Sequence, residues 1–467
     1  MDSSASKELK KLLGDGNVRT GARALAPYFA VPVKDSALMV VTPETPNQLS
    51  DAAAFAHQNE IPLYSVRRRF IEDAGLASKE GILVDLSKMN RIKKIDAANL
   101  VAHVYGGVTF EQLQAELDKE GQRLLFPVAG LSPSVLRSYV DRDMLMGSGG
   151  YRHPHVSVFH AMLADGEVWV SGSQQLADEG HADFREDQGP QFSQFFGASE
   201  DIFGIPYYGL VYTYPNRQER RLVAVGFDDL EPAKDLIYKV SRAEWCFEAF
   251  CANDRYLSVV LARGDSSKVP ALRKKLNPWT AVITMEHYTE LVELWERYTR
   301  EAAKELGGKQ LRGQMPELIE TNLKRPWYVY DRDFFLGRCR HVFGFQHFGG
   351  VPETFEALDG AVAEAGLKPD ELGKVVVPTY FGGAAYCEAD IYYNPGDPAA
   401  SSAAETGYLK AFEALLDTRA LVDKPTGPVA EMVFSRTDPS YVNMIRTFKR
   451  TVDPRGNLNP DQLLEGV

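Results

Sequence analysis

The stretch that decides the fold is LVDLSKMNRI, residues 83–92. In it, a run of branched apolar residues ends at a polar turn, as a strand does. Outward from it, similar apolar runs alternate with amphipathic segments. LMVVTP (38–43) and IPLYSV (61–66) are typical of strands, and TPNQLSDAAAFAHQNE (45–60) between them has the periodicity of a helix. Strands separated by a helix predict an α/β unit in this part of the chain.

A second group of elements follows. VAHVYGG (101–107) is predicted as a strand, and TFEQLQAELDKEG (109–121) as a helix that begins at a threonine cap. In AMLADGEVWVSGS, Asp165 and Gly166 separate two apolar runs as a hairpin turn does. GIPYYGLVYTYP (204–215) is predicted as a strand that proline closes.

Residues 219–435 repeat the alternation of strands and helices, which predicts a second α+β unit with a mostly antiparallel sheet. The expected strands are RRLVAVGF (220–227), YLSVVLAR (256–263), RHVFGFQHF (340–348), KVVVPTYF (374–381) and AYCEADIYYN (385–394). The expected helices include EPAKDLIYKVSRAEW (231–245), PETFEALDGAVAEAG (352–366) and PSYVNMIRTFKRTV (439–452), the last of which lies beyond this unit.

Composition excludes several classes of protein. The 64 acidic and 52 basic residues give a formal net charge of −12, which repels a phosphate backbone, so nucleic acid is not an expected partner. No apolar run reaches the roughly 18 residues that cross a bilayer, and the first residues do not resemble a signal peptide. We therefore expect no membrane insertion and a cytoplasmic location.

The four cysteines, Cys246, Cys251, Cys339 and Cys387, lack the paired spacing of a zinc or iron-sulfur site. The sequence therefore predicts no metal site, and any iron-sulfur cluster must belong to another subunit.

Six short motifs together resemble the vanillyl-alcohol oxidase / p-cresol methylhydroxylase (PCMH) family of FAD-linked oxidases, and most closely its 4-alkylphenol branch. They occur in the family's order from about Pro43 to the C-terminal segment, which makes a chance match improbable. They are residues 83–92, Gly107-Val108-Thr109-Phe110, Leu163-Ala164-Asp165-Gly166, Phe203-Gly204-Ile205, Asp453-Pro454 and Asn459-Pro460. The resemblance implies an α+β fold, with a two-subdomain PCMH-type FAD-binding domain and an α+β cap over the flavin.

The resemblance also implies a division of the chain. We expect an N-terminal arm over 1–33, an FAD-binding-like domain over 34–217, and a cap domain over 218–435. The C-terminal segment, 436–467, is expected to return to the first domain.

The family's diphosphate loop is glycine-rich, because backbone amides must approach phosphate oxygens closely and several positions need left-handed dihedrals. The corresponding stretch here is RRRFIEDA, residues 67–74, which has no glycine. Its side chains would fill the space of the diphosphate, and each of its two carboxylates would repel a phosphate charge by about 3 kcal/mol at about 5 Å. Arg67, Arg68 and Arg69 act in the opposite sense, since a guanidinium can bind phosphate bidentately. Three interpretations of these arginines stay open: a clamp for phosphate, a patch at a protein interface, or a turn exposed to solvent.

Other positions that face the flavin in the family are altered too. RSYVDRDM (137–144) keeps Asp141 and Arg142 but loses an early Gly-Asn pair, and Gly204 and Ile205 are followed by a proline that removes a backbone donor. Asn459 is followed by Pro460-Asp461-Gln462 in place of Pro-Gly-Lys. FAD is the cofactor that the family implies, and we predict that this chain lacks it or binds it weakly.

Several other side chains admit a functional and a structural interpretation. His153 and His155 could act as acid, base or metal ligand, but a loop or hydrogen-bonding role is expected more often. The tyrosines could line a pocket, although aromatic residues that alternate along strands usually belong to a core or an interface. They are Tyr207, Tyr208, Tyr380, Tyr386, Tyr392 and Tyr393. No catalytic residue can be transferred from the family by motif.

Three functions agree with this pattern. The preferred one is a non-catalytic or cofactor-poor subunit that pairs with an FAD-bearing paralogue, together with a separate iron-sulfur or cytochrome subunit if electrons are passed on. The second is an active FAD-dependent dehydrogenase or oxidase of a phenolic, benzylic or hydroxy-acid substrate, with an arginine-based FAD site. The third is a small-molecule binding protein.

Overall fold

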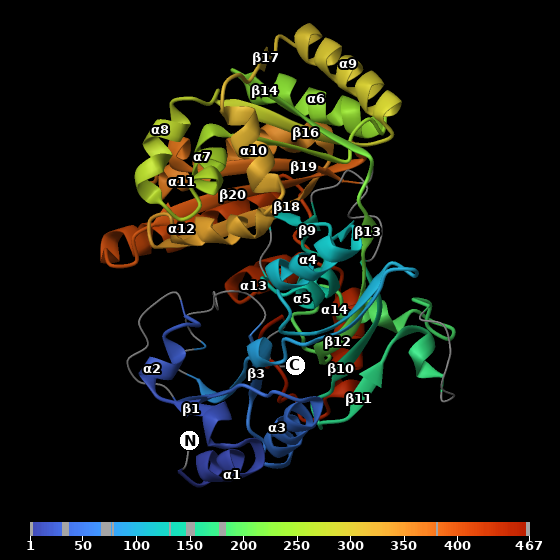
Figure 1. The fold of residues 1–467 in the computed structure, drawn as a ribbon. Helices are drawn as coiled ribbons and strands as arrows, with labels where there is room; N and C mark the ends of the chain where they lie inside the picture. The colour runs from blue at the N-terminus through green and yellow to red at the C-terminus, as the bar shows by residue number, and fades with distance from the viewer. Residues whose placement is uncertain are drawn as a thin grey trace.

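The computed structural model describes residues 3–29, 37–66, 76, 79–129, 132–145, 155–176, 184–379 and 382–463. Two units stack in Figure 1: a large sheet with its helices lies above, and two smaller sheets lie below. The expected α+β class with mostly antiparallel sheets is confirmed, because among the strands of the described residues only β2, β4 and β3 of the first sheet pair in parallel.

The first sheet has the strand order β1-β2-β4-β3. Its parallel strands are β2 (Ala37–Val41), β4 (Glu80–Val84) and β3 (Leu63–Ser65), and β1 (Val18–Thr20) pairs antiparallel with β2. Helix α3 (Pro46–Gln58) connects β2 to β3 as predicted, and its first turn is capped by the Thr45 side chain, which accepts a hydrogen bond from the Gln48 amide. Helix α1 (Ser3–Leu13) packs against α3.

The second sheet has the order β11-β10-β12-β6-β5 and is antiparallel. The predicted hairpin turn is confirmed, since Gly166 between β10 and β11 has φ 90°, and a Cβ there would lie 2.8 Å from the Ser50 carbonyl oxygen of α3. The strands are β5 (Ile92–Asp96), β6 (Val101–Tyr105), β10 (Val156–Met162), β11 (Val168–Val170) and β12 (Ile205–Tyr212). Helices α4 (Phe110–Leu117) and α5 (Val135–Val140) cover it.

The upper sheet has seven antiparallel strands in the order β17-β14-β16-β15-β19-β20-β18. The strands are β14 (Glu219–Phe227), β15 (Glu248–Asn253), β16 (Trp279–His287), β17 (Lys309–Gln310), β18 (Arg338–Gln346), β19 (Gly373–Thr379) and β20 (Ala384–Tyr393). Helices α6 (Leu230–Arg242), α9 (Thr289–Glu305), α11 (Val351–Glu364) and α12 (Pro398–Asp417) share one core with its outer face.

The inner face of this sheet packs toward the first unit. Phe343, Val375 and Tyr386 belong to the same core as residues of α4 and α5, whereas their neighbours Val376 and Cys387 belong to the outer core. This alternation follows from the two-residue period of a strand. Helices α7 (Asp254–Ala262) and α10 (Met315–Leu323) and the 3-10 segment η9 (Pro326–Phe334) lie on the inner face.

One predicted strand is wrong. YLSVVLAR (256–263) forms most of α7 instead, because the Asn253 side chain caps the helix by accepting from the Tyr256 amide. The strands β15 and β16 were not predicted. An apolar run of eight residues does not distinguish a strand from a buried helix by period alone.

The C-terminal segment lies against the first sheet. Helix α14 (Pro439–Val452) matches the predicted helix, and Leu458 forms a parallel bridge with Leu63 of β3. The Leu63 amide donates to the Asn457 carbonyl, and the Asn459 amide donates to the Leu63 carbonyl, each at 2.7 Å. We keep the expected domain boundaries as a proposal.

The remaining short elements are α2 (Ala22–Leu25), β7 (Gln122–Arg123), β8 (Pro127–Ala129), β9 (Met144–Leu145), β13 (Tyr214–Pro215), α8 (Val269–Arg273) and α13 (Pro428–Ser435). Within the described ranges, no helix is both long enough and apolar enough to cross a bilayer.

Candidate functional site

The residues predicted for the cofactor face come from four separate segments. Arg67, Arg68 and Arg69 lie outside the described residues. Asp141 and Arg142 follow α5, Gly204 and Ile205 stand at the start of β12, and Asn459 lies in the C-terminal segment.

A buried ion pair lies where these segments meet. Arg137 of α5 pairs with Asp201, and both side chains are almost fully buried, with exposed fractions of 3% and 1%. Asp201 also accepts a 2.5 Å hydrogen bond from the Ser65 hydroxyl at the end of β3. Arg137 donates in addition to the Pro206 carbonyl at 3.4 Å. The guanidinium and the carboxylate therefore satisfy each other inside the protein.

Asn459 joins the same network from the C-terminal segment. Its Oδ1 accepts from the Ser65 amide at 2.9 Å, and its Nδ2 donates to the Ser65 hydroxyl and to the Asp201 carbonyl. The structure thus brings Asn459 together with Ser65, Asp201 and Arg137, three residues that the sequence analysis did not select.

Arg142 and its neighbours connect this region to the upper unit. Arg142 has φ 57° and donates to the Gly197 carbonyl at 3.3 Å. Lys424, in the loop after α12, is buried and reaches the Arg142 carbonyl at 3.2 Å and the Asp143 carboxylate at 3.4 Å. The loop after α5 is therefore held by a lysine of the upper unit.

The surviving glycines of this region serve packing between protein atoms. A Cβ on Gly204 would lie 2.9 Å from a ring carbon of Phe196, and one on Gly209 would lie 2.5 Å from a methyl of Leu136. A Cβ on Gly107 would lie 2.3 Å from the Leu86 carbonyl oxygen. At each of these three glycines the space that a side chain would need is occupied by other protein atoms.

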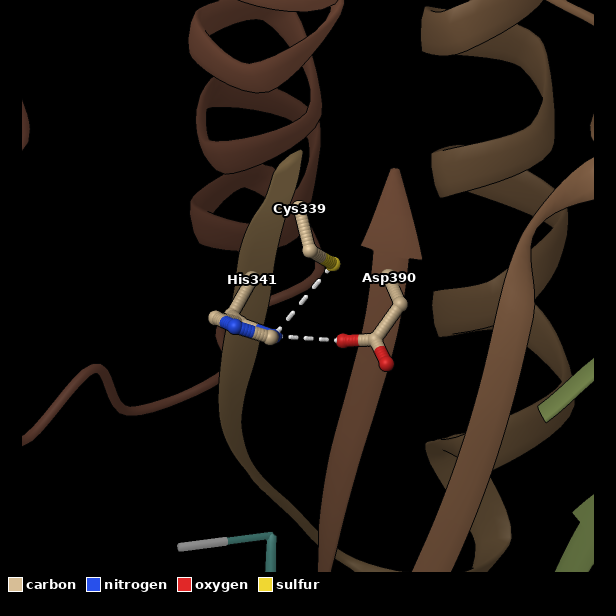
Figure 2. A group of neighbouring side chains, drawn as sticks. All are labelled: Cys339, His341 and Asp390. Atoms are coloured by element: carbon tan, nitrogen blue, oxygen red, sulfur yellow. Dashed lines mark hydrogen bonds and ion pairs between the residues drawn. The ribbon is translucent and has the colours of Figure 1, made fainter. Parts of the chain in front are cut away.

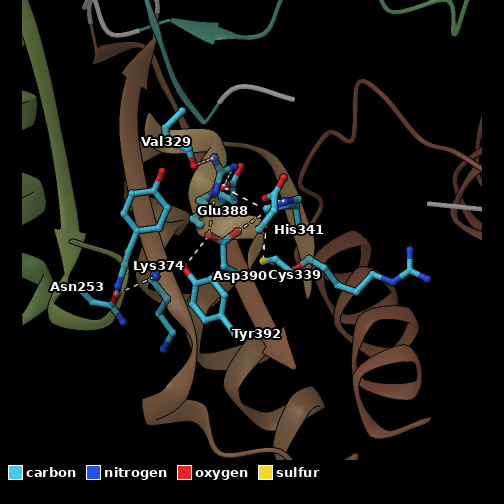
Figure 3. A network of polar contacts seen from close by, with 12 residues as sticks. Asn253, Val329, Cys339, His341, Lys374, Glu388, Asp390 and Tyr392 are labelled. Carbon is cyan, nitrogen blue, oxygen red and sulfur yellow. Dashed lines mark hydrogen bonds and ion pairs between the residues drawn. The ribbon is translucent and has the colours of Figure 1, made fainter. Parts of the chain in front are cut away.

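A second buried polar cluster lies on the inner face of the upper sheet (Figure 3). Arg332 of η9 is fully buried, and it donates to Glu388 at 3.1 Å, to Asp390 at 3.2 Å and to the Val329 carbonyl. Tyr386 donates to Glu388 at 2.5 Å, and Tyr392 donates to Asp390 at 2.9 Å.

His341 on β18 completes this cluster. Its Nδ1 lies 2.6 Å from Asp390 Oδ1, its Nε2 lies 3.0 Å from Asp333 Oδ1, and Cys339 Sγ lies 3.7 Å from Nδ1. Figure 2 shows the cysteine, the histidine and Asp390 pointing toward one another from adjacent strands.

In this cluster the positive charge of the His341–Asp390 pair lies on His341 and the negative charge on Asp390. Burial opposes a charge on His341, but Cys339 and Asp390 beside it raise the pKa of the imidazole well above its usual value. Burial also opposes the charge of Asp390, yet His341 and Arg332 hold the pKa of that carboxyl below its usual range. Burial raises the pKa of Glu388 despite the nearby guanidinium. A proton between His341 and Asp390 therefore resides on the imidazole.

Two further features adjoin these networks. Both carboxylate oxygens of Asp423, next to Lys424, are buried without a hydrogen-bond partner among the described residues. A cavity of about 720 Å³ lies beside the C-terminal segment and is lined by residues of α13 and α14 together with Lys79 and Asp461. It is large enough for a small organic ligand.

The other residues selected from the sequence are either buried in the structure or outside the described residues. His153 and Tyr380 lie outside the described residues. His155 is buried, and its Nδ1 lies 2.9 Å from the Tyr214 hydroxyl. Tyr207 and Tyr208 are buried in the lower core.

Sequence reasoning missed the residues that organise both networks. Asp201 carried no motif of its own. Its position three residues before Gly204 in a matched segment was the available signal. His341 and Asp390 lie on predicted strands. The available signal for a buried polar cluster was that charged residues share a strand face with Tyr386.

Comparisons with known proteins agree with this architecture. Residues 37–172 match the family model of an FAD binding domain. The chain is 28% identical over 180 residues to the 4-cresol dehydrogenase [hydroxylating] flavoprotein subunit of Pseudomonas putida, which covers 36% of this chain and 34% of that protein. It is 26% identical over 235 residues to 1'-carboxy-chondrochloren decarboxylase of Chondromyces crocatus, covering 46% of this chain and 43% of that protein. Each match spans less than half of the relative's length.

Two solved structures share the fold over nearly the whole chain. Substrate-bound p-cresol methylhydroxylase gives a TM-score of 0.82 at 17% identity, covering 98% of this chain and 96% of that one. The isoeugenol complex of 4-ethylphenol oxidase from Gulosibacter chungangensis gives 0.82 at 16% identity, covering 99% and 97%.

The matched domain and the shared architecture define a protein of the FAD-linked oxidase fold, in which residues 37–172 of the lower unit match an FAD binding domain. The comparisons agree with the resemblance to p-cresol methylhydroxylase-type FAD-linked oxidases that the sequence motifs predicted, through an FAD binding domain over residues 37–172 and a shared fold over nearly the whole chain.

Proposed function

We propose that this chain is a non-catalytic or cofactor-poor subunit of a heteromeric flavin-dependent oxidoreductase, in which a paralogous subunit carries the FAD. The observation that supports this proposal is the closed network of Arg137, Asp201, Ser65 and Asn459 at the expected cofactor face. These side chains use their hydrogen-bonding groups on one another.

An anionic cofactor gains little from such a network. A phosphate charge placed about 5 Å from the Asp201 carboxylate is repelled by about 3 kcal/mol, which corresponds to about two decades in affinity. The paired Arg137 guanidinium offsets part of this repulsion through space. It can donate hydrogen bonds to a phosphate only by giving up Asp201, and an uncompensated buried carboxylate costs about 3 to 5 kcal/mol.

The likeness to a subunit of a known enzyme supports the proposed partner subunit. The P. putida relative is named as a flavoprotein subunit, so a related chain acts as part of an assembly. An electron-transfer subunit with an iron-sulfur cluster or a cytochrome would complete such an enzyme. None of the four cysteines of this chain is paired in a disulfide.

The second candidate function is that of an active FAD-dependent oxidoreductase with a phenolic, benzylic or hydroxy-acid substrate. The match to an FAD binding domain over residues 37–172 favours it. In this case Arg67, Arg68 and Arg69 would hold the diphosphate in place of backbone amides. A third candidate, a small-molecule binding protein, is favoured by the cavity beside α14.

The test is to purify the tagged chain from its native cells and to separate the subunits that accompany it. Each subunit is denatured, and released and covalently retained flavin are measured by absorbance. We expect a yellow paralogue in stoichiometric amount and less than one tenth of an equivalent of flavin on this chain. One flavin per tagged chain would overturn the proposal in favour of the active enzyme, and a colourless chain purified without any partner would favour the binding protein.

A further inference from the structure

Three potential metal ligands lie close together on the inner face of the upper sheet. Cys339 and His341 are two residues apart on β18, so their side chains project from the same face of the strand. Asp390 stands directly opposite His341 in the antiparallel pairing of β18 with β20. The sulfur, nitrogen and oxygen atoms all lie within 4.8 Å of one another (Figure 2).

These separations are close to those of a tetrahedral site. Zinc bonds of about 2.3 Å to sulfur and about 2.0 to 2.1 Å to nitrogen and oxygen place the sulfur about 3.5 Å, and the oxygen about 3.4 Å, from the nitrogen. Cys339 Sγ already lies 3.7 Å from His341 Nδ1. The 2.6 Å contact of Nδ1 with Asp390 Oδ1 is a hydrogen bond that has to open by less than 1 Å.

The groups behind these atoms are arranged as they are behind metal ligands. A histidine that binds a metal through one nitrogen almost always donates its other N–H to a carboxylate or carbonyl. His341 Nε2 has such a partner in Asp333 Oδ1, 3.0 Å away. Asp390 is fixed in the same way, because Arg332 and Tyr392 donate to its Oδ2 and leave Oδ1 directed at His341.

The charge of the surroundings is compatible with a divalent ion. Asp333, Glu388 and Asp390 are three carboxyl groups around two cationic groups, the Arg332 guanidinium and the His341 imidazolium. A divalent ion would displace the thiol proton of Cys339 and the imidazole proton on Nδ1, so the net charge of the cluster would not change. Cys339 and Asp333 are only partly buried, which leaves a route for the ion from solvent.

We propose that Cys339 Sγ, His341 Nδ1 and Asp390 Oδ1 bind one Zn²⁺, with solvent in the fourth position and Asp333 orienting the imidazole. The mixed sulfur, nitrogen and oxygen ligands suit zinc and its spectroscopic substitute cobalt better than Mg²⁺ or Ca²⁺. This site goes beyond the proposed function and does not depend on it. It contradicts the sequence-based expectation of no metal site, because the ligands come from strands that are 49 positions apart in the chain.

The test is a titration of the reduced, metal-free full chain with Co²⁺ under anaerobic conditions. We expect one equivalent to produce the near-ultraviolet thiolate-to-cobalt charge-transfer band and the visible bands of a four-coordinate ion. Zn²⁺ is expected to displace the cobalt in equimolar amount. Absence of the charge-transfer band from the wild-type chain would overturn the proposal.

Two cysteine variants separate this site from other thiols. Cys339→Ser is expected to abolish the band, whereas Cys246→Ser, at a partly buried cysteine outside the cluster, is expected to keep it. A band that survives in Cys339→Ser, or that is lost equally in both variants, would also overturn the site. Asp333→Asn leaves the three ligands in place, and we expect Co²⁺ affinity to fall by about 10- to 100-fold with the band retained. An unchanged affinity in this variant would contradict the orienting role of Asp333, and it keeps the proposal testable if Cys339→Ser does not fold.

Discussion

Single residues at the expected cofactor face make their strongest contacts with other protein residues. Asp201 connects α5, the end of β3 and the C-terminal segment through Arg137, Ser65 and Asn459. The sequence predicted Asn459 as a cofactor position from the family motif, but its hydrogen-bond partners could not be predicted. They lie 394 and 258 positions away in the chain, and no local pattern encodes a contact of that range.

Replacing Asp201 by asparagine tests the energetic importance of this network. The variant leaves Arg137 buried without its counter-charge, so we expect the free energy of unfolding to fall by about 3 to 5 kcal/mol in urea denaturation. Asp96→Asn is a matched control, because Asp96 forms an ion pair with the exposed Lys94 and accepts from the Asn99 amide, which an asparagine oxygen can still do, so the expected loss is below about 1 kcal/mol. Equal losses in the two variants would contradict a buried, structural ion pair.

At the scale of elements, short motifs predicted most of the strands and helices that define the family. β18 and β20 were predicted close to their observed bounds, because each is a long run rich in aromatic residues, which favour strands. Helix α7 was predicted as a strand, since its composition suits both structures. The deciding interaction is made by Asn253, just before the helix, which contacts β19 and the preceding turn from 119 to 121 positions away.

Asn253→Ala tests that explanation. The Asn253 Oδ1 accepts from the amides of Tyr256 and Lys374, and its Nδ2 donates to the Leu372 carbonyl. Removing these contacts leaves buried backbone groups unsatisfied, so we expect a loss of about 2 to 4 kcal/mol and faster amide exchange at the start of α7. Asn394→Ala, at an exposed turn, is expected to change stability by less than about 1 kcal/mol. A similar loss at Asn394 would argue against the capping explanation.

At the scale of the whole molecule, buried polar contacts join the upper unit, which we expect to be the cap, to the lower unit near the expected cofactor face. Lys424 of the cap is buried against Asp143 and the Arg142 carbonyl, and Arg123 of β7 pairs with Glu286 of β16. The overall architecture could be predicted because ordered motifs carry it. The contacts between the units could not, since a single lysine in a loop has no signature in the sequence.

Lys424→Met tests whether Lys424 holds the upper unit against the lower unit. It keeps most of the side-chain volume but leaves the Asp143 carboxylate without the ammonium group, so we expect the chain to lose about 3 kcal/mol of stability. Hydrogen exchange is expected to increase in residues 141–145 and 420–427, while β15 in the cap core stays protected. Lys410→Met, which removes an exposed pair with Glu364, is the control. Unchanged exchange at residues 141–145 would show that Lys424 does not hold the two units together.

The measurement that tests the central claim most directly is calorimetric titration of FAD into the full chain, in the absence of any partner, at physiological salt. The closed network at the cofactor face predicts no saturable binding at micromolar concentrations of chain and FAD. A stoichiometric isotherm with a dissociation constant below about 1 µM, equivalent to about −8 kcal/mol, would contradict the claim that this chain does not hold an FAD of its own.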